Sequence, residues 1–178
     1  MKLTAKAEAQ ISLQDYSKKT IIEGVEILNL KRFNDDGGSF TELGRLSSGI
    51  PEALPDFEIK QVNYSEMSPE AIKAFHVHRN QTDVWFVPPR DKILLVLADA
   101  REGSETEGVV MRIPLGDFNS RLVKIPPGVA HGCKNVATEN GQIIYFVNQV
   151  FSADPDISDE GRLPWDYFGT DVWEIEKG

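Results

Sequence analysis

IPPGVAHGCKN (residues 125–135) and AFHVH (residues 74–78) are the two stretches that decide how this chain folds. Together they hold all three histidines of the protein. His76 and His78 alternate with Phe75 and Val77, so on a β-strand both imidazoles point to one face. In the second stretch a Pro-Pro-Gly turn ends just before His131. Two strands lining one small barrel would bring the three imidazoles into one cavity, which predicts a site for proton transfer, metal binding or both.

The composition indicates one acidic, soluble domain. The chain has 178 residues and a formal net charge of −9. Such a charge argues against nucleic acid as a partner, because phosphate binding needs a basic field. The lone Cys133 cannot form an intrachain disulfide, which fits a reducing compartment. The N-terminal residues show neither a signal-peptide core nor a run that could span a membrane. We therefore expect a cytoplasmic protein with no membrane partner.

Short runs of β-branched and aromatic residues between turn signals predict an all-β barrel or sandwich with little helix. The absence of paired cysteines around a tryptophan disfavours an immunoglobulin-type domain. We expect an N-terminal arm over residues 1–20 and a single barrel domain over residues 21–178, with a C-terminal tail packed on it through Trp165 and Trp173. A tight turn is expected at residues 34–38, a loop at 47–55 and one helical turn at 68–71. The expected strands are 21–30, 40–43, 57–65, 72–78, 84–87, 93–99, 109–115, 122–125, 134–136 and 142–151.

Two further side chains belong to the chemical hypothesis. Asp83 would complete three histidines and one carboxylate as a set of metal ligands, although a turn carboxylate is slightly favoured. Tyr145 lies on an apolar strand and would act either as a general acid or as a hydrogen-bonded barrel tyrosine. Each histidine also has a purely structural interpretation as a hydrogen-bonded barrel residue. Anion contacts are candidates among the cationic residues Lys73, Arg79, Arg101, Arg112 and Lys124.

The histidine segments resemble the two motifs of the cupin superfamily. The second segment has Pro126, Gly128, His131 and Asn135 in the spacing Pro-x-Gly-x-x-His-x-x-x-Asn. The first has His-x-His, with Asp83 where many cupins have a glutamate. The resemblance implies a cupin jelly roll, a double-stranded β-helix that closes into a barrel.

A longer ordered series resembles one cupin family, the dTDP-4-dehydrorhamnose 3,5-epimerases. It covers about residues 21–175 and is far more specific than any single match. The matching segments are IEGV (22–25), DDGGSFTE (35–42), QVNYS (61–65), KAFH (73–76), DAREGS (99–104), IPPGVAHG (125–132) and the closing stretch 161–173.

This resemblance implies a cofactor-free and metal-free epimerase of a 4-keto, nucleotide-linked sugar. By position, His76 would be the base and Tyr145 the acid on the opposite face of the sugar, with His131 as a polarising or orienting group. The family is also usually a homodimer that exchanges N-terminal strands, and we expect the same here. The implied substrate contacts are Glu42, Gln61, Asn63, Lys73, His78 and Arg101.

The chain departs from the family pattern at positions that bear on its chemistry. Gly37 and Lys73 stand where the family has phosphate-binding arginines, and His78 stands where it usually has glutamine. The family pattern has a lysine after the first histidine, and its position falls near Asp83 or Val84 in this chain. The family's C-terminal segment, whose aspartate pairs with the catalytic histidine, has no counterpart, so we expect no orienting carboxylate from it. Two alternatives stay open: a metal-dependent cupin enzyme holding one divalent transition metal through His76, His78, Asp83 and His131, and a non-catalytic sugar-binding cupin.

Overall fold

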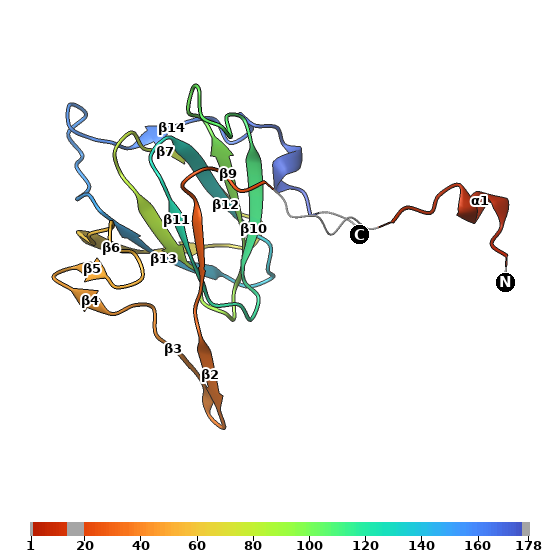
Figure 1. Cartoon of the computed structure of the whole chain (residues 1–178), viewed down its shortest axis with the longest axis horizontal. Coiled ribbons are helices and arrows are strands. Elements are labelled where there is room, and N and C mark those ends of the chain that lie inside the picture. The colour runs from red at the N-terminus through yellow and green to blue at the C-terminus, as the bar shows by residue number, and fades with distance from the viewer. Residues whose placement is uncertain (1, 14–19, 176–178) are drawn as a thin grey trace.

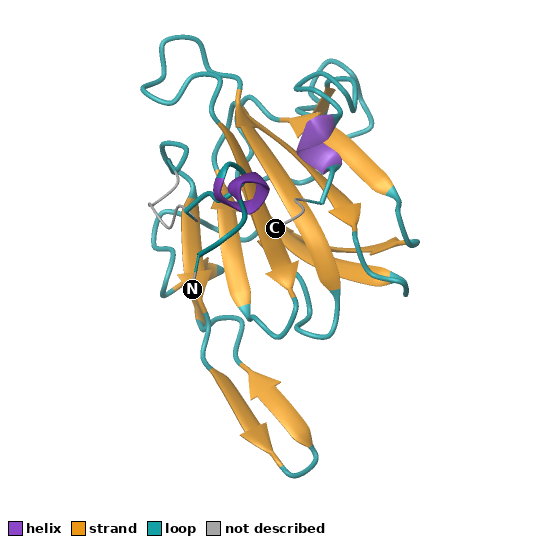
Figure 2. Cartoon of the chain, turned by 90° about the vertical axis from the view of Figure 1, so that its right-hand side faces the viewer, coloured by secondary structure: helices purple, strands orange, loops and turns teal. Residues whose placement is uncertain are grey.

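Two five-stranded antiparallel sheets form a barrel in the computed structural model, which describes residues 2–13 and 20–175 (Figures 1 and 2). One sheet has the strand order β1-β11-β8-β13-β6, and the other has the order β10-β9-β12-β7-β14. The all-β cupin jelly roll expected from the sequence is confirmed. The main strands are β1 (Glu26–Asn29), β6 (Gln61–Met67), β7 (Ile72–Val77), β8 (Asp83–Phe86), β9 (Lys92–Asp99), β10 (Val110–Gly116), β11 (Arg121–Ile125), β12 (Val129–Asn135), β13 (Gly141–Val147) and β14 (Gly161–Arg162).

The core follows from strand alternation. On β9, Ile93, Leu95 and Leu97 belong to the apolar cluster shared with the facing sheet, whereas Leu94 and Val96 belong to a second cluster on the other side. Strand β9 is therefore buried on both faces, as its continuous apolar run predicted. The second cluster also receives the tail, because Val172 and Trp173 of the short helix η1 (Asp171–Trp173) are buried in it. Trp173 lies 5.1 Å from the Phe75 ring, between centroids.

The two histidine segments are neighbouring strands of one sheet. Strand β12 pairs with β7 so that His131 lies directly opposite His76. The sequence predicted a strand only from residue 134, but β12 begins at Val129, because its whole length also pairs with β9. Gly132 permits the close approach: a Cβ at this position would lie 2.3 Å from the Cβ of Ala74. The register thus brings the two segments together by backbone pairing.

Several expected boundaries are wrong. Strand β6 begins at Gln61, not residue 57, because the Ile59 N–H donates to Gly49 O instead of to a sheet neighbour. The expected loop 47–55 contains Ser47 of β4 (Leu46–Ser47) and all of β5 (Ile50–Pro51), and these two strands pair as a small hairpin. Residues 68–71 form a turn without a helix, residues 21–25 lie outside β1, and β13 ends at Val147. Of the two tryptophans expected to anchor the tail, Trp173 is buried, whereas Trp165 is 48% exposed.

One hairpin projects from the barrel (Figures 1 and 2). It consists of β2 (Arg32–Asp35) and β3 (Gly38–Thr41), and it confirms the turn predicted at residues 34–38. Within the expected arm, the structure describes one short helix, α1 (Ala5–Glu8), with no buried residue, while residues 1 and 14–19 lie outside the described part of the chain. No helix of the described residues has the length and apolar character needed to cross a bilayer.

Candidate functional site

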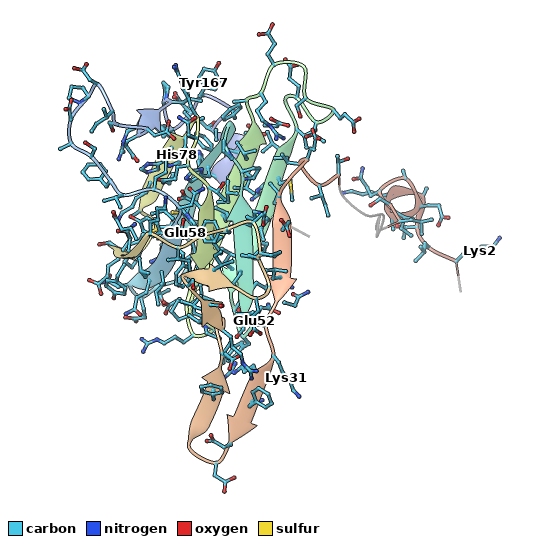
Figure 3. The ribbon with its side chains drawn as sticks, turned by 60° about the vertical axis from the view of Figure 1, so that its left-hand side comes forward. Lys2, Lys31, Glu52, Glu58, His78 and Tyr167 are labelled. Carbon is cyan, nitrogen blue, oxygen red and sulfur yellow. The ribbon has the colours of Figure 1, made fainter. Side chains whose placement is uncertain are left out.

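A cavity of about 360 Å³ lies between the two sheets. Strands β6, β8 and β13 of one sheet and β7 and β12 of the other contribute to its walls, and the segment leading to β14 closes its rim. Figure 3 shows His78 near the end of the barrel that also carries Tyr167. The lining side chains are mostly polar: Ser65, Lys73, His76, His78, Gln81, Asp83, Trp85, His131, Cys133, Ile143, Tyr145, Phe151, Glu160 and Arg162.

His76 has a carboxylate partner. Its Nδ1 lies 2.6 Å from Oε1 of Glu160, and both side chains are partly exposed to the cavity mouth. A carboxylate accepts hydrogen bonds, so Nδ1 carries the proton and Nε2 of the neutral ring keeps its lone pair. No orienting carboxylate was expected from the sequence. Glu160 supplies one from the acidic tail, where β14 pairs with β7 and brings the tail alongside His76.

His131 is buried between the other aromatic groups. Its ring stacks on that of His76 with centroids 5.9 Å apart, and the Trp85 ring meets it edge-on at 5.6 Å. Burial lowers the pKa of His131 to about 4, although the nearby Asp83 charge acts in the opposite direction. The imidazole is therefore neutral at neutral pH, with its Nδ1 donating to Val129 O at 3.2 Å.

Tyr145 reaches the cavity from the sheet opposite to that of His76. It lies on β13, paired with Asn63 of β6, and its ring centroid is 5.9 Å from that of Trp85. Burial raises the pKa of Tyr145, and the charges of Asp83 and Glu160 raise it further. The phenol therefore holds its proton at neutral pH. A base on one wall and a proton donor on the other are the two groups that inversion at a carbon requires.

His78 and Asp83 form a buried polar cluster with His131. Asp83 opens strand β8 and is only 3% exposed, so it is a wall residue of the cavity and not the turn carboxylate that was slightly favoured. Its oxygens accept hydrogen bonds from Gln81 Nε2 at 2.8 Å and Trp85 Nε1 at 3.1 Å. His78, Asp83 and His131 each have one atom that could ligate a metal ion, and these three atoms lie within 4.8 Å of one another. His76 is not part of this group.

Asp159 fixes the loop that carries this cluster. Its carboxylate accepts the backbone N–H groups of Arg79, Asn80 and Gln81 at 2.8–3.0 Å. Burial alone would raise the pKa of Asp159, but these backbone donors outweigh it and lower the pKa. The Asp159 carbonyl in turn accepts from His78 Nδ1 at 2.7 Å. Two successive tail residues therefore orient two histidines, Asp159 for His78 and Glu160 for His76.

The remaining predicted contacts divide between the cavity and its surroundings. Lys73 lines the cavity, where its Nζ donates to Ser65 Oγ at 2.8 Å. Gln61 is not among the described lining residues; its Nε2 donates to Asn63 Oδ1 at 2.7 Å, and its Oε1 accepts from the Phe151 N–H at 2.9 Å.

Two of the predicted substrate contacts lie outside the described cavity lining and stay predictions. Glu42 is exposed and pairs with Arg45, its neighbour three residues along the chain. Arg101 is held by the buried Asp99, whose oxygens lie 2.8 Å from its guanidinium nitrogens. The described lining includes neither residue.

The fold and the cavity together define a class of protein: a cupin jelly roll whose lumen joins a histidine–carboxylate pair to a partly buried tyrosine. The sequence profile of the dTDP-4-dehydrorhamnose 3,5-epimerase family matches residues 19–166. The chain belongs to this family of 4-keto-sugar epimerases, which confirms the resemblance and favours the epimerase over the metal-dependent and non-catalytic alternatives.

Three relatives illustrate the similarity. The spore coat polysaccharide biosynthesis protein SpsL of Bacillus subtilis (strain 168) is 39% identical over 82% of this chain and 91% of its own. The solved dTDP sugar isomerase of Desulfovibrio desulfuricans G20 is 28% identical, with a TM-score of 0.72 over 85% of this chain and 92% of that one. The dTDP-4-dehydrorhamnose 3,5-epimerase of Bacillus anthracis, solved with TDP and PPi bound, is 26% identical, with a TM-score of 0.66 over 83% of each chain.

Proposed function

We propose that this cavity epimerises a 4-keto-6-deoxy sugar linked to a nucleoside diphosphate, with His76 as base and Tyr145 as acid. The observation that carries the assignment is the placement of the two groups: His76, oriented by Glu160, on one sheet and Tyr145 on the other. Proton transfer between an imidazole oriented by a carboxylate and a phenol across one cavity suits inversion at a carbon next to a ketone.

Each inversion follows from these positions. The Nε2 lone pair of His76 takes the hydrogen of a carbon flanking the ketone as a proton. The C–H electron pair moves into a new C=C bond, and the ketone π electrons go to oxygen as an enolate. Tyr145 then donates its hydroxyl proton to the opposite face of the same carbon, and the C=O bond re-forms. The neutral imidazole of His131 lies beside His76 and would orient the ring of the sugar. Solvent returns the proton of Tyr145 and removes that of His76.

The nucleotide part of the substrate is supported by the family and by the TDP and PPi bound to the Bacillus anthracis relative. In this chain Lys73 and Arg162 are the cationic side chains among the described residues of the lining. The test is to incubate the protein with dTDP-linked and GDP-linked 4-keto-6-deoxyglucose and to follow epimer formation by NMR. We expect turnover of the dTDP sugar. Absence of turnover with both substrates would contradict the proposal.

Glu160 is expected to act as a positioning residue for His76. Replacing Glu160 by Gln removes the acceptor charge from Nδ1 but keeps the size of the side chain. Losing the orienting partner of a functional histidine typically costs 10–100-fold, so we expect kcat to fall by about this factor while KM changes less than threefold. Steady-state kinetics measures the changes in kcat and KM separately.

The matched control for Glu160→Gln is Asp156→Asn, which removes an exposed carboxylate from the same tail segment. It should leave kcat within twofold of wild type. Equal losses in both variants, or a loss confined to KM, would show that Glu160 does not act through His76.

We also propose a cytoplasmic homodimer. The projecting β2–β3 hairpin supports the dimer, because its Phe33 and Phe40 are 47% and 60% exposed and their ring centroids lie 6.4 Å apart on the hairpin. Apolar side chains on a projecting hairpin are typical of an interface. Sedimentation velocity should give a dimer for the wild type and a monomer for the double variant Phe33→Ser/Phe40→Ser. A wild-type monomer would contradict the proposal. The single, buried Cys133 is compatible with a reducing cytoplasm.

A further inference from the structure

The cavity wall contains a buried carboxylate that exchanges no proton in the proposed reaction. Asp83 lines the cavity and is 3% exposed. Its Oδ1 accepts a hydrogen bond from Gln81 Nε2 at 2.8 Å, and its Oδ2 accepts one from Trp85 Nε1 at 3.1 Å. An amide N–H and an indole N–H only donate, so both carboxylate oxygens act as acceptors. A carboxylate offers about four lone-pair sites, so each oxygen of Asp83 can accept a further hydrogen bond.

The two imidazoles beside Asp83 also present acceptors. Nδ1 of each ring faces a backbone carbonyl oxygen, at 2.7 Å for His78 and 3.2 Å for His131, so each Nδ1 carries the proton. Nε2 of His78 lies 3.3 Å from the Gln81 amide nitrogen, which only donates, and the neutral ring of His131 keeps the lone pair of its Nε2. These two Nε2 atoms lie 3.8 and 3.6 Å from the Asp83 oxygens, which is too far for a hydrogen bond.

This group of acceptors selects the kind of ligand that can lie against it. A ketone oxygen only accepts, so it has no partner there, whereas a hydroxyl group can donate its hydrogen. Both cationic side chains of the described lining donate to other groups, Lys73 to Ser65 and Arg162 to Glu160. A ligand edge that carries hydroxyl groups therefore complements this wall of the cavity.

We propose that Asp83 determines the specificity of the cavity by accepting hydrogen bonds from two adjacent hydroxyl groups of the sugar. The choice of sugar rests on the proposed function: a 4-keto-6-deoxyhexose linked through C1 has free hydroxyls at C2 and C3. This diol edge would face Asp83, with Nε2 of His131 as a further acceptor, and the ketone oxygen would point away from them. A sugar without the C2 hydroxyl would leave an acceptor of the buried carboxylate unpaired, which a buried polar group tolerates poorly.

The test compares dTDP-4-keto-6-deoxyglucose with its 2-deoxy analogue, with EDTA present so that no metal ion bridges Asp83 and the sugar. A site that hydrogen-bonds a hydroxyl rejects the analogue lacking it by up to about 10⁴–10⁵-fold. Because one of the two hydroxyls remains, we expect wild-type kcat/KM to favour the 2-hydroxy sugar by about 10²-fold or more. Asp83→Asn and Asp83→Ala should each lower this preference at least about tenfold, and using two variants guards against misfolding of either.

Asp91→Asn is the matched control. Asp91 is also a buried carboxylate, 5% exposed, but it accepts from the Gln142 N–H at 3.0 Å and does not belong to the described lining. Its variant should keep the wild-type preference between the two sugars. Equal kcat/KM for both sugars in wild type, or the full preference in a cooperatively melting Asp83 variant, would overturn the inference.

Binding of the two sugars to His76→Ala separates this inference from the proposed function, because binding needs no turnover. Calorimetry should give a Kd about 10²-fold lower for the 2-hydroxy sugar than for the 2-deoxy sugar. Such discrimination without any turnover by wild type would refute the epimerase and leave the assignment of Asp83 standing. Turnover of both sugars with equal kcat/KM would do the reverse.

Discussion

Replacing His76 by Ala is expected to lower kcat for epimerisation by about 10³-fold or more. General-base catalysis contributes about 10²–10⁴-fold to a rate. The other two histidines of the described lining, His78 and His131, are buried and hydrogen-bonded to backbone carbonyls, so we expect neither to replace His76 as the base. The measurement is the initial rate of epimer formation by NMR, together with deuterium incorporation from D₂O.

The His76 variant must be shown to be folded, and a second variant, His76→Gln, retains more of the side-chain volume. Both should melt cooperatively. The assignment of His76 as the base would be wrong if a folded variant kept the rate within tenfold of wild type.

Tyr145→Phe is expected to separate the two halves of the reaction. His76 would still remove the proton, so deuterium should enter the recovered starting sugar from the original face. Without the Tyr145 hydroxyl, no group would return a proton to the opposite face, so net epimerisation should fall by about 10²–10⁴-fold. NMR of the sugar recovered from D₂O measures both quantities in one sample.

Tyr64→Phe is the matched control for Tyr145→Phe. Tyr64 lies on neighbouring strand β6, is 57% exposed, and donates its hydroxyl hydrogen to Glu66 at 2.8 Å, away from the cavity lining. It should react at the wild-type rate. If Tyr145→Phe epimerises as fast as this control, another group returns the proton.

Patterns with a strong local cause were predictable from the sequence. The alternation around His76 placed two imidazoles on one face, and the Asn-Asp-Asp-Gly-Gly turn at residues 34–38 placed the β2–β3 hairpin. The apolar run of β9 predicted a strand buried on both faces. Boundaries were predicted less well where pairing partners decide them: β12 extends from Val129 because β7 and β9 both pair with it, and no local pattern in residues 129–133 reveals those partners.

The side chains that orient the site were the hardest to find. Glu160 lies in an acidic, turn-rich tail, and no local sequence pattern distinguishes it from the other acidic residues there. Only the pairing of β14 with β7 brings it to His76. Asp83 looked like a turn residue because polar residues surround it, yet it is the first residue of a buried strand. Glu42 and Arg101 matched the family pattern by position; each forms a local ion pair, and the described cavity lining includes neither.

The most direct test of the central claim is proton NMR of dTDP-4-keto-6-deoxyglucose in D₂O with the wild-type protein. The account predicts that signals of hydrogens on carbons flanking the ketone disappear, with epimer appearing at a comparable rate, while the other sugar hydrogens persist. Retention of every carbon-bound hydrogen after prolonged incubation with folded protein would contradict it, because a cavity built for proton transfer next to a ketone must exchange those hydrogens with solvent.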